Sequence, residues 1–315
     1  MSNSAVQPVS LAQSDADPEG FARDLGASFE RYGFAVVSDH GLDTTLVDRA
    51  LADTKAFFAL PEDAKLAYKG RNGARGYTPF GVETAKGAAA HDLKEFWHVG
   101  RDIPPGHPYA KYMAPNVWPA EVPGFHDSLS ELYAALDGVG LRLLSAIARH
   151  LKLPPDWFDD KVRLGNSILR LLHYPPVKPE NAGHVRAGAH EDINVITLLL
   201  GAEEAGLELL ARNEDGSTEW LPISPPPGAL VVNIGDMLQR LTNGVLPSTS
   251  HRVVNPAPER MGVSRYSTPF FLHFEPEFMI EALPGCRGPG RPEGGEPPIM
   301  AEDFLGERLR EIKLA

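Results

Sequence analysis

A histidine and an aspartate stand two positions apart in the segment 189–193, as His190 and Asp192. On a β-strand, residues i and i+2 project to the same face, so both side chains could reach one metal ion while Glu191 points away. A third ligand has to come from elsewhere, and His251, beside a strand-like run, is the candidate. Two imidazoles and one carboxylate on one face of an octahedral ion leave three positions open, which can take a bidentate co-substrate and dioxygen.

The His-x-Asp pair taken alone is compatible with other kinds of site. A second pair of similar type, His273 and Glu275, lies further along the chain, and a histidine near an acid is often a hydrogen-bonded structural pair. Two histidines and a carboxylate could also hold zinc in a hydrolase. The residues around the pair favour the iron interpretation over these alternatives.

Downstream, Arg265 and Ser267 point the same way if their segment is extended. A guanidinium beside a hydroxyl suits a carboxylate, because arginine makes a forked, charge-assisted pair and serine adds a third hydrogen bond. The alternative is that Arg265 pairs with an internal acid. Upstream, Tyr174 precedes a rigid Pro-Pro corner, where its ring could equally be part of the core.

The N-terminal half, which has to support these residues, is predicted to be mainly helical. Capping residues, proline positions and apolar spacing indicate three helices: from Asp17 to Gly33, from Asp43 or Thr44 to just before Pro61, and from about Asp127 to Leu151. A short buried strand is expected over 34–37. Residues 69–92 are rich in glycine and are expected to be irregular or to form a hairpin.

The second half changes to short, strand-like segments separated by turn residues. These are 168–172, 195–200, 207–211 and 229–234, with a hairpin turn signal at 213–216. The spacing favours an antiparallel sandwich or jelly roll. In the stretch 284–298, ten of fifteen residues are Gly or Pro, which predicts a surface loop, and a final helix is expected from about Ala301.

Composition narrows the function classes. The chain of 315 residues carries a formal net charge of −12 and no compensating basic run, so nucleic-acid binding is not expected. Its single cysteine, Cys286, excludes an intrachain disulfide and cysteine-based zinc or iron–sulfur sites, and fits a reducing compartment. No signal peptide or apolar stretch of membrane-spanning length is evident, so a cytoplasmic protein without a membrane partner is expected.

Several motifs, in this order, resemble the isopenicillin N synthase-like Fe(II)/2-oxoglutarate-dependent dioxygenases. In the N-terminal half they are 32–34, 39–41, 57–61 and Gly76-Tyr77; in the second half they are 174–176, His190-x-Asp192, 228–236, 242–244, 251–253 and Arg265-x-Ser267. The resemblance covers about residues 8 to 310. It implies a mostly β fold with flanking helices, built on a distorted double-stranded β-helix, or jelly-roll, core.

The resemblance also implies roles for individual residues. His190, Asp192 and His251 match the iron ligands, Arg265 and Ser267 match the pair that binds the distal carboxylate of 2-oxoglutarate, and Tyr174 matches a supporting tyrosine. No protein side chain beyond the metal ligands is expected to be catalytic. The family pattern further predicts an N-terminal region over 1–120, and the long helix, jelly-roll core and C-terminal tail over 121–315, packed as one globular unit.

Two departures from the family pattern concern the site. About four extra residues around 257–261 lengthen the interval between His251 and Arg265, which is expected to reshape a surface turn without moving the site. An asparagine often found two residues before the tyrosine is Leu172 here, so the surroundings of the co-substrate are expected to differ.

The expected function is therefore that of a non-haem oxygenase with Fe(II), 2-oxoglutarate and dioxygen, acting on an unidentified small molecule. Oxidative decarboxylation of 2-oxoglutarate and a ferryl intermediate would lead to hydroxylation, desaturation, cyclisation or ethylene formation. Two alternatives stay open at this point. One is an Fe(II) oxidase of the same family that uses the Arg–Ser pair for its substrate; the other is a non-catalytic, metal-dependent binding module. Candidates to line or cover the pocket are the stretch 70–81, Phe96, Trp97, Phe271 and His273, and the oligomeric state is not predicted.

Overall fold

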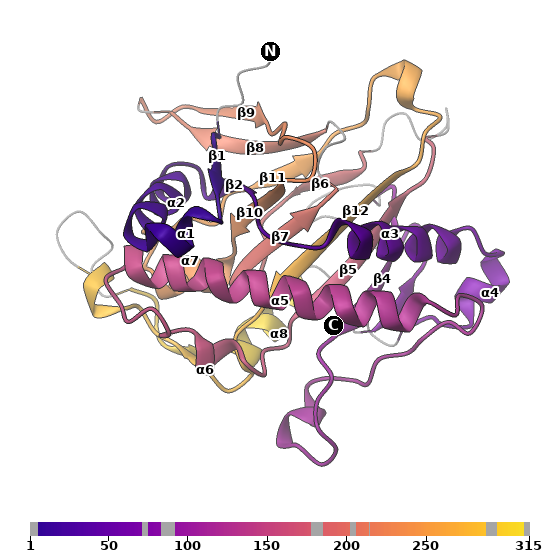
Figure 1. Ribbon diagram of the computed structural model, residues 1–315, viewed down its shortest axis with the longest axis horizontal. Coiled ribbons are helices and arrows are strands. Elements are labelled where there is room, and N and C mark those ends of the chain that lie inside the picture. Colours follow the sequence, from indigo (N-terminus) through magenta and orange to yellow (C-terminus); the bar gives the residue numbers. More distant parts are fainter. Residues whose placement is uncertain are drawn as a thin grey trace.

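The computed structural model describes residues 6–70, 75–82, 92–177, 185–201, 206–213, 215–287 and 295–311. A large sheet of eight strands and a smaller sheet of four strands face each other, and helices cover the outer face of the large sheet (Figure 1). The fold is mostly β, with the double-stranded β-helix core that the sequence predicted. None of the helices in the described ranges is long and apolar enough to span a membrane.

The N-terminal elements begin as the sequence predicts. Asp17 caps α2 (Pro18–Tyr32) by accepting a hydrogen bond from the backbone N–H of Gly20 at 2.8 Å. Gly33 ends this helix with φ of 67°, a left-handed conformation that favours glycine, and a Cβ there would lie 2.5 Å from the carbonyl oxygen of Pro247. The chain then enters the buried strand β2 (Phe34–Ser38).

The remaining elements before the core are short except for two helices. Helix α3 starts after the capping residue Asp43, and α5 lies across the large sheet (Figure 1). The bounds are β1 (Pro8–Ser10), α1 (Gln13–Ala16), α3 (Thr44–Phe58), α4 (Glu62–Leu66), β3 (Gly76–Thr78), β4 (Glu95–Gly100), the 3-10 helix η2 (Pro108–Lys111), α5 (Phe125–His150) and α6 (Asp159–Val162).

From β5 to β12 the chain alternates between the two sheets, except that the hairpin strands β8 and β9 both lie in the small sheet, and this path defines the jelly roll. The large sheet takes β5 (Ile168–Tyr174), β7 (Ile196–Leu200), β10 (Leu230–Ile234) and β12 (Arg265–Leu272). The small sheet takes β6 (Ala187–His190), β8 (Leu207–Arg212), β9 (Thr218–Pro222) and β11 (His251–Val253). The rest comprises α7 (Asp236–Leu241), η4 (Pro258–Arg260), β13 (Met279–Ile280), η5 (Pro284–Cys286), β14 (Ile299–Met300) and α8 (Ala301–Glu311).

Strands from the N-terminal part extend the large sheet of the core. Its order is β1-β2-β10-β7-β12-β5-β4-β3, and every pairing within it is antiparallel except that of β1 with β2. The first 100 residues therefore supply four of the eight strands of this sheet. The support of the site comes from both halves of the chain.

Two apolar clusters hold the layers together. The larger lies between the helices and the large sheet and includes Phe21, Trp97, Leu136 and Phe270, all at most 2% exposed. The smaller lies between the two sheets. The alternation of side chains along each strand of the large sheet sends one set to the helices and the other set toward the small sheet. The second set is the one that can build a site between the sheets.

Three predictions concerned turns, loops and irregular segments. The hairpin turn is confirmed: β8 pairs with β9, and Gly216 has φ of 84°, while Glu214 lies outside the described residues. The region 69–92 contains β3, which pairs with β4 just after this region. The sequence analysis did not predict β4. The predicted loop 284–298 contains η5 before the undescribed residues 288–294, and the final helix begins at Ala301 as expected.

Candidate metal centre and co-substrate site

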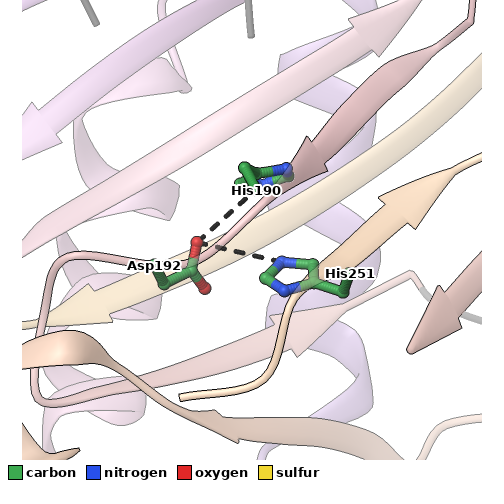
Figure 2. A group of neighbouring side chains, drawn as sticks. All are labelled: His190, Asp192 and His251. Atoms are coloured by element: carbon green, nitrogen blue, oxygen red, sulfur yellow. Dashed lines mark ion pairs between the residues drawn. The ribbon is translucent and has the colours of Figure 1, made fainter. Parts of the chain in front are cut away.

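The small sheet and the loop that follows β6 bring the three candidate ligands together. His190 ends β6, His251 begins β11, and the two are direct partners in the antiparallel register. Asp192 follows two residues after His190. One ligand atom from each of the three lies within 4.8 Å of the other two, and Figure 2 shows the side chains converging.

Each histidine is held by its Nδ1 atom. The Nδ1–H group of His190 donates to the carbonyl oxygen of Gly188 at 2.7 Å, and that of His251 donates to the carbonyl oxygen of Thr249 at 3.1 Å. A backbone carbonyl can only accept, so the proton lies on Nδ1 and the lone pair lies on Nε2. Both Nε2 atoms lie 3.9 Å from Oδ1 of Asp192.

The two carboxylate oxygens of Asp192 have different partners: Oδ2 is hydrogen-bonded to the protein and Oδ1 faces the two histidines. Its Oδ2 atom accepts hydrogen bonds from Thr197 Oγ1 at 2.5 Å and from Asn233 Nδ2 at 2.8 Å. Its backbone carbonyl accepts from the N–H of Asp236 at 2.7 Å. These contacts fix the carboxylate and turn Oδ1 toward the two imidazoles, so the three atoms that face one another are two nitrogens and one oxygen.

The electrostatic environment favours the protonation states that bind a metal. Burial and the neighbouring His251 lower the pKa of His190 to about 4, so this imidazole is neutral at pH 7. Burial by itself would raise the pKa of Asp192, but the charges of His251 and His190 and the hydrogen bonds from Asn233 and Thr197 outweigh it and hold this pKa below its usual range. A neutral imidazole and an ionised carboxylate are the forms that act as ligands.

Arg265 and Ser267 lie side by side on β12, as predicted. Both are buried, and Nη1 of Arg265 donates to Oγ of Ser267 at 3.2 Å. Tyr174 is the register partner of Arg265 on β5, and the guanidinium carbon lies 5.2 Å from the centre of its ring. The alternative pairing with an internal acid is not what the structure shows, because no ion pair of Arg265 is present among the described residues.

A narrow cavity of about 60 Å³ between the sheets joins both groups of residues. All six predicted site residues line it, and so does Leu172, which occupies the position where relatives often have asparagine. The extra residues near 257–261 form η4, an exposed turn between β11 and β12. Phe271 also lines the cavity, as predicted.

Sequence reasoning missed several polar residues of this cavity. Lys94 and Arg170 line it, and Lys94 forms a buried ion pair with Asp92 at 3.0 Å. Asp92 accepts a hydrogen bond from the N–H of Gly188, whose carbonyl in turn holds His190. An Asp-Leu-Lys segment before a strand carries no signal of this connection, because it arises only where the segment before β4 packs against β6.

Other candidates lie elsewhere. The second His-x-acid pair does not form a metal site. Glu275 accepts a hydrogen bond from the backbone N–H of Leu164 at 3.1 Å. Among the described residues, neither His273 nor Glu275 is part of a group of side chains that could bind a metal ion. Trp97 is buried against Phe57 and Phe125 on the helical side, and Phe96 is buried beside the cavity without lining it. Part of the stretch 70–81 lies outside the described residues.

A larger cavity of about 420 Å³ opens on the opposite face of the large sheet, under α3. Its walls include Lys55, Leu132, Tyr266 and Thr268, and none of the candidate metal ligands. This cavity is larger than the narrow one between the sheets. The chemistry favours the smaller one, because among the described residues it is where the three candidate metal ligands and the Arg265–Ser267 pair come together.

The comparisons with known proteins agree with this geometry. Residues 6–121 match the family described as non-haem dioxygenase in morphine synthesis N-terminal, and residues 165–274 match the 2OG-Fe(II) oxygenase superfamily. A relative, the 2-oxoglutarate-Fe(II) type oxidoreductase hxnY of Emericella nidulans, is 35% identical over 289 residues, which cover 88% of this chain and 80% of the relative.

Two solved structures extend the agreement to the fold. A 2OG-Fe(II) oxygenase family protein from Caulobacter crescentus is 60% identical, with a TM-score of 0.91 over 98% of this chain and 100% of that one. A full-length Neurospora crassa protein in complex with alpha-KG is 29% identical, with a TM-score of 0.83 over 98% of this chain and 97% of that one.

The chain belongs to the 2OG-Fe(II) oxygenase superfamily. It is a non-haem oxidoreductase of the class that depends on Fe(II) and 2-oxoglutarate.

Proposed function

We propose that His190, Asp192 and His251 bind the Fe(II) ion, and that Arg265, Ser267 and Tyr174 hold 2-oxoglutarate beside it. The observation that supports this most strongly is the hydrogen bonding of the three side chains. Nδ1 of each histidine and Oδ2 of Asp192 are hydrogen-bonded to the protein, and the remaining nitrogen or oxygen atom of each side chain faces the other two. Ligands fixed by a second layer of hydrogen bonds are typical of built metal sites. The donor set of two imidazoles and one carboxylate fits Fe(II) with open positions.

The protein residues of this site have separate roles. The ligands fix the metal, the Arg265–Ser267 pair orients the far carboxylate of the co-substrate, and the apolar walls exclude water. Bound Fe(II) supplies the redox chemistry that activates dioxygen, with 2-oxoglutarate as the reductant. A small-molecule substrate is typical of the class. The cytoplasmic location and the lack of a nucleic-acid partner stay predictions.

The metal assignment is tested by anaerobic titration of the apoprotein with Fe(II) and then 2-oxoglutarate, following the visible charge-transfer band between them. We expect the band only when both are present. Asp192→Ala should lose iron binding and the band, because it removes the sole anionic ligand. Glu191→Ala, a change of the exposed neighbouring acid, is the matched control and should keep both. Full metal affinity in Asp192→Ala would overturn the ligand assignment.

The co-substrate assignment is tested with Arg265 variants in the same titration. Arg265→Ala should weaken 2-oxoglutarate binding by about 10- to 100-fold while Fe(II) still binds, because a charge-assisted fork is lost. Arg265→Lys keeps the charge without the fork and should fall between the wild type and Arg265→Ala. An unchanged 2-oxoglutarate affinity in Arg265→Ala would show that another residue anchors the co-substrate.

A further inference from the structure

The larger cavity under α3 has the size and the walls of a small-molecule site. It measures about 420 Å³, whereas close-packed protein interiors leave few voids larger than a water molecule. One face of α3, from Thr44 to Lys55, forms one wall, and β5, β7 and β12 of the large sheet form the opposite wall. Because α3 packs mainly against α5, the space between α3 and the sheet stays open.

The middle of this cavity is apolar. Val47 and Leu51 of α3 are half-buried there, and they share the lining with Leu132 of α5, Leu171 of β5 and Leu200 of β7. An occupant with an apolar body would remove the half-buried side chains from water, which favours binding. The cavity therefore suits a molecule with an apolar middle section.

Two side chains of opposite charge border this cavity. Asp48 and Lys55 line it from α3, are exposed, and take part in no ion pair or side-chain hydrogen bond among the described residues. Lys55 follows Asp48 by two turns of helix, roughly 10 Å along the helix axis. The ammonium nitrogen of Lys55 lies 5.5 Å from the centre of the Tyr266 ring, which also lines the cavity, and this contact keeps the positive charge beside the opening.

His40 completes the wall without adding a charge. Its Nε2–H group donates to the carbonyl oxygen of Gly228 at 2.7 Å, and its Nδ1 atom accepts from the backbone N–H of Leu42 at 3.2 Å. A ring nitrogen that accepts a hydrogen bond carries no proton, so this imidazole is neutral. The cavity therefore offers one negative and one positive charge, at Asp48 and Lys55, with Leu51 between them on α3.

The strand β12 separates this cavity from the metal centre. Tyr266 and Thr268 line the cavity under α3, whereas Arg265 lines the cavity of the metal ligands and Ser267 borders both. Alternate residues of a strand point to opposite faces of its sheet, so a molecule under α3 lies behind the co-substrate anchor. The occupant is therefore a second ligand and not the molecule that is oxidised at the metal.

We propose that the cavity under α3 binds an elongated zwitterion with an apolar body, whose ammonium lies at Asp48 and whose carboxylate lies at Lys55. Unbranched ω-amino carboxylic acids of about eight carbons have this form, because their extended chain places the two charges about as far apart as two turns of helix. A molecule with a single charge would pair with only one of the two side chains. The inference does not depend on the chemistry proposed for the metal centre.

The experiment uses the Fe(II)-loaded protein under anaerobic conditions, with and without saturating 2-oxoglutarate. The probe ω-aminooctanoate is titrated in, and the heat of binding gives its affinity. Octanoate and octylamine are matched probes that each lack one charge, and γ-aminobutyrate has both charges but is too short to span the two residues. We expect ω-aminooctanoate to bind the wild type about three- to tenfold more tightly than each of the other probes, because charge pairs at a partly exposed rim are individually weak. Its affinity should change by less than about twofold when 2-oxoglutarate is present, because the two ligands occupy opposite faces of the sheet.

Two variants assign each charge of the probe to one residue. Lys55→Met should bind ω-aminooctanoate about as weakly as the wild type binds octylamine, because each combination lacks the same charge pair. Asp48→Asn should bind it about as weakly as the wild type binds octanoate, for the corresponding reason. Both changes are at exposed positions of α3, so the fold is retained. Lys111→Met removes another exposed lysine stacked on a tyrosine, here Tyr112, and should leave every affinity unchanged.

The contrary outcomes are equally definite. If ω-aminooctanoate does not bind the wild type, or binds both variants as tightly as the wild type, Asp48 and Lys55 recognise no zwitterion and the proposal is wrong. If 2-oxoglutarate competes with the probe, the probe binds in the metal cavity and the proposal is equally wrong. The charge-transfer band of the same samples reports on the metal centre separately. A wild type that shows the band but fails these tests overturns only this inference, and a wild type without the band contradicts the proposed function, whatever the result with ω-aminooctanoate.

Discussion

At the scale of single residues, the site depends on which atom of each ligand the protein leaves for the metal. The Nδ1 atoms of the histidines and Oδ2 of Asp192 are all engaged by neighbours, and their other atoms converge. Thr197 is the most informative of these neighbours, because its hydroxyl binds the carboxylate directly and its side chain is 3% exposed. A buried carboxylate that loses such a donor is less well oriented and less readily ionised.

Thr197→Val tests this arrangement because valine keeps the shape of threonine and removes its hydroxyl. We expect Fe(II) affinity to fall about 10- to 100-fold, the usual cost of losing a partner of a metal ligand. The midpoint of the anaerobic Fe(II) titration measures the change. Thr197→Ser, which retains the hydroxyl, should stay near the wild type. Equal affinities in all three proteins would show that Asn233 alone orients the carboxylate.

At the scale of elements, the ends of strands position the ligands. β6 delivers His190 at its last residue and β11 delivers His251 at its first, so the antiparallel register of two short strands places both imidazoles together. The segment before β4 reinforces β6, since Asp92 holds the peptide of Gly188. The helices have a different role, because α2 and α5 pack together on the far face of the large sheet and contribute stability without supplying a candidate metal ligand.

Asp17→Ala tests this division between positioning strands and stabilising helices. Removing the side chain that caps α2 should lower the free energy of unfolding by about 1 kcal/mol and leave Fe(II) affinity unchanged. Urea unfolding and the anaerobic titration give the two numbers. Asp24→Ala, which changes an exposed acid of the same helix paired only with an exposed arginine, should alter neither by a measurable amount. A metal-affinity loss in Asp17→Ala would mean that α2 also shapes the site.

At the scale of the whole molecule, a buried polar network joins the N-terminal elements to the core. Glu95 on β4 accepts hydrogen bonds from Lys65 of α4 and from His173 of β5, each at 2.7 Å, and from Tyr77 of β3. Burial alone would raise the pKa of Glu95, but the hydrogen bonds from His173, Lys65 and Tyr77 outweigh burial and hold it below the usual range. The ionised carboxylate therefore stabilises the assembled fold.

Glu95→Gln should make this contribution visible through pH. A group whose pKa is lower in the folded state stabilises fully above its unfolded value of 4.5, and the stabilisation is lost as pH falls through the folded value. At pH 7 the variant should unfold more easily by about 2 kcal/mol. The difference from the wild type, measured by urea unfolding, should shrink as pH falls below the unfolded pKa of 4.5. A pH-independent difference would mean that shape, not charge, is what Glu95 supplies.

The amino-acid sequence by itself determined the chemistry of the site and most of the elements around it. His190 and Asp192 are two residues apart, a spacing that by itself predicts a shared metal site. In the structure Asp192 lies in the loop after β6, and Thr197 and Asn233 orient its carboxylate. Arg265 and Ser267 have the same spacing. The helix ending at Gly33 was predictable because capping and the left-handed conformation are local preferences of residue types. The order of the motifs along the chain then allowed the family resemblance, which agreed with His251 as the third ligand.

Only the tertiary structure decided which of the remaining polar residues serve the site. Thr197 and Asn233 bind the carboxylate of Asp192, and Asp92 binds the N–H of Gly188, whose carbonyl oxygen holds His190. Arg170 lines the cavity from β5, the strand between β4 and β12. It also decided between the two His-x-acid pairs, and it revealed β4, a strand buried along its whole length. These choices depend on strand register and sheet order, which are set by packing between distant segments and leave no periodic signal in any one of them.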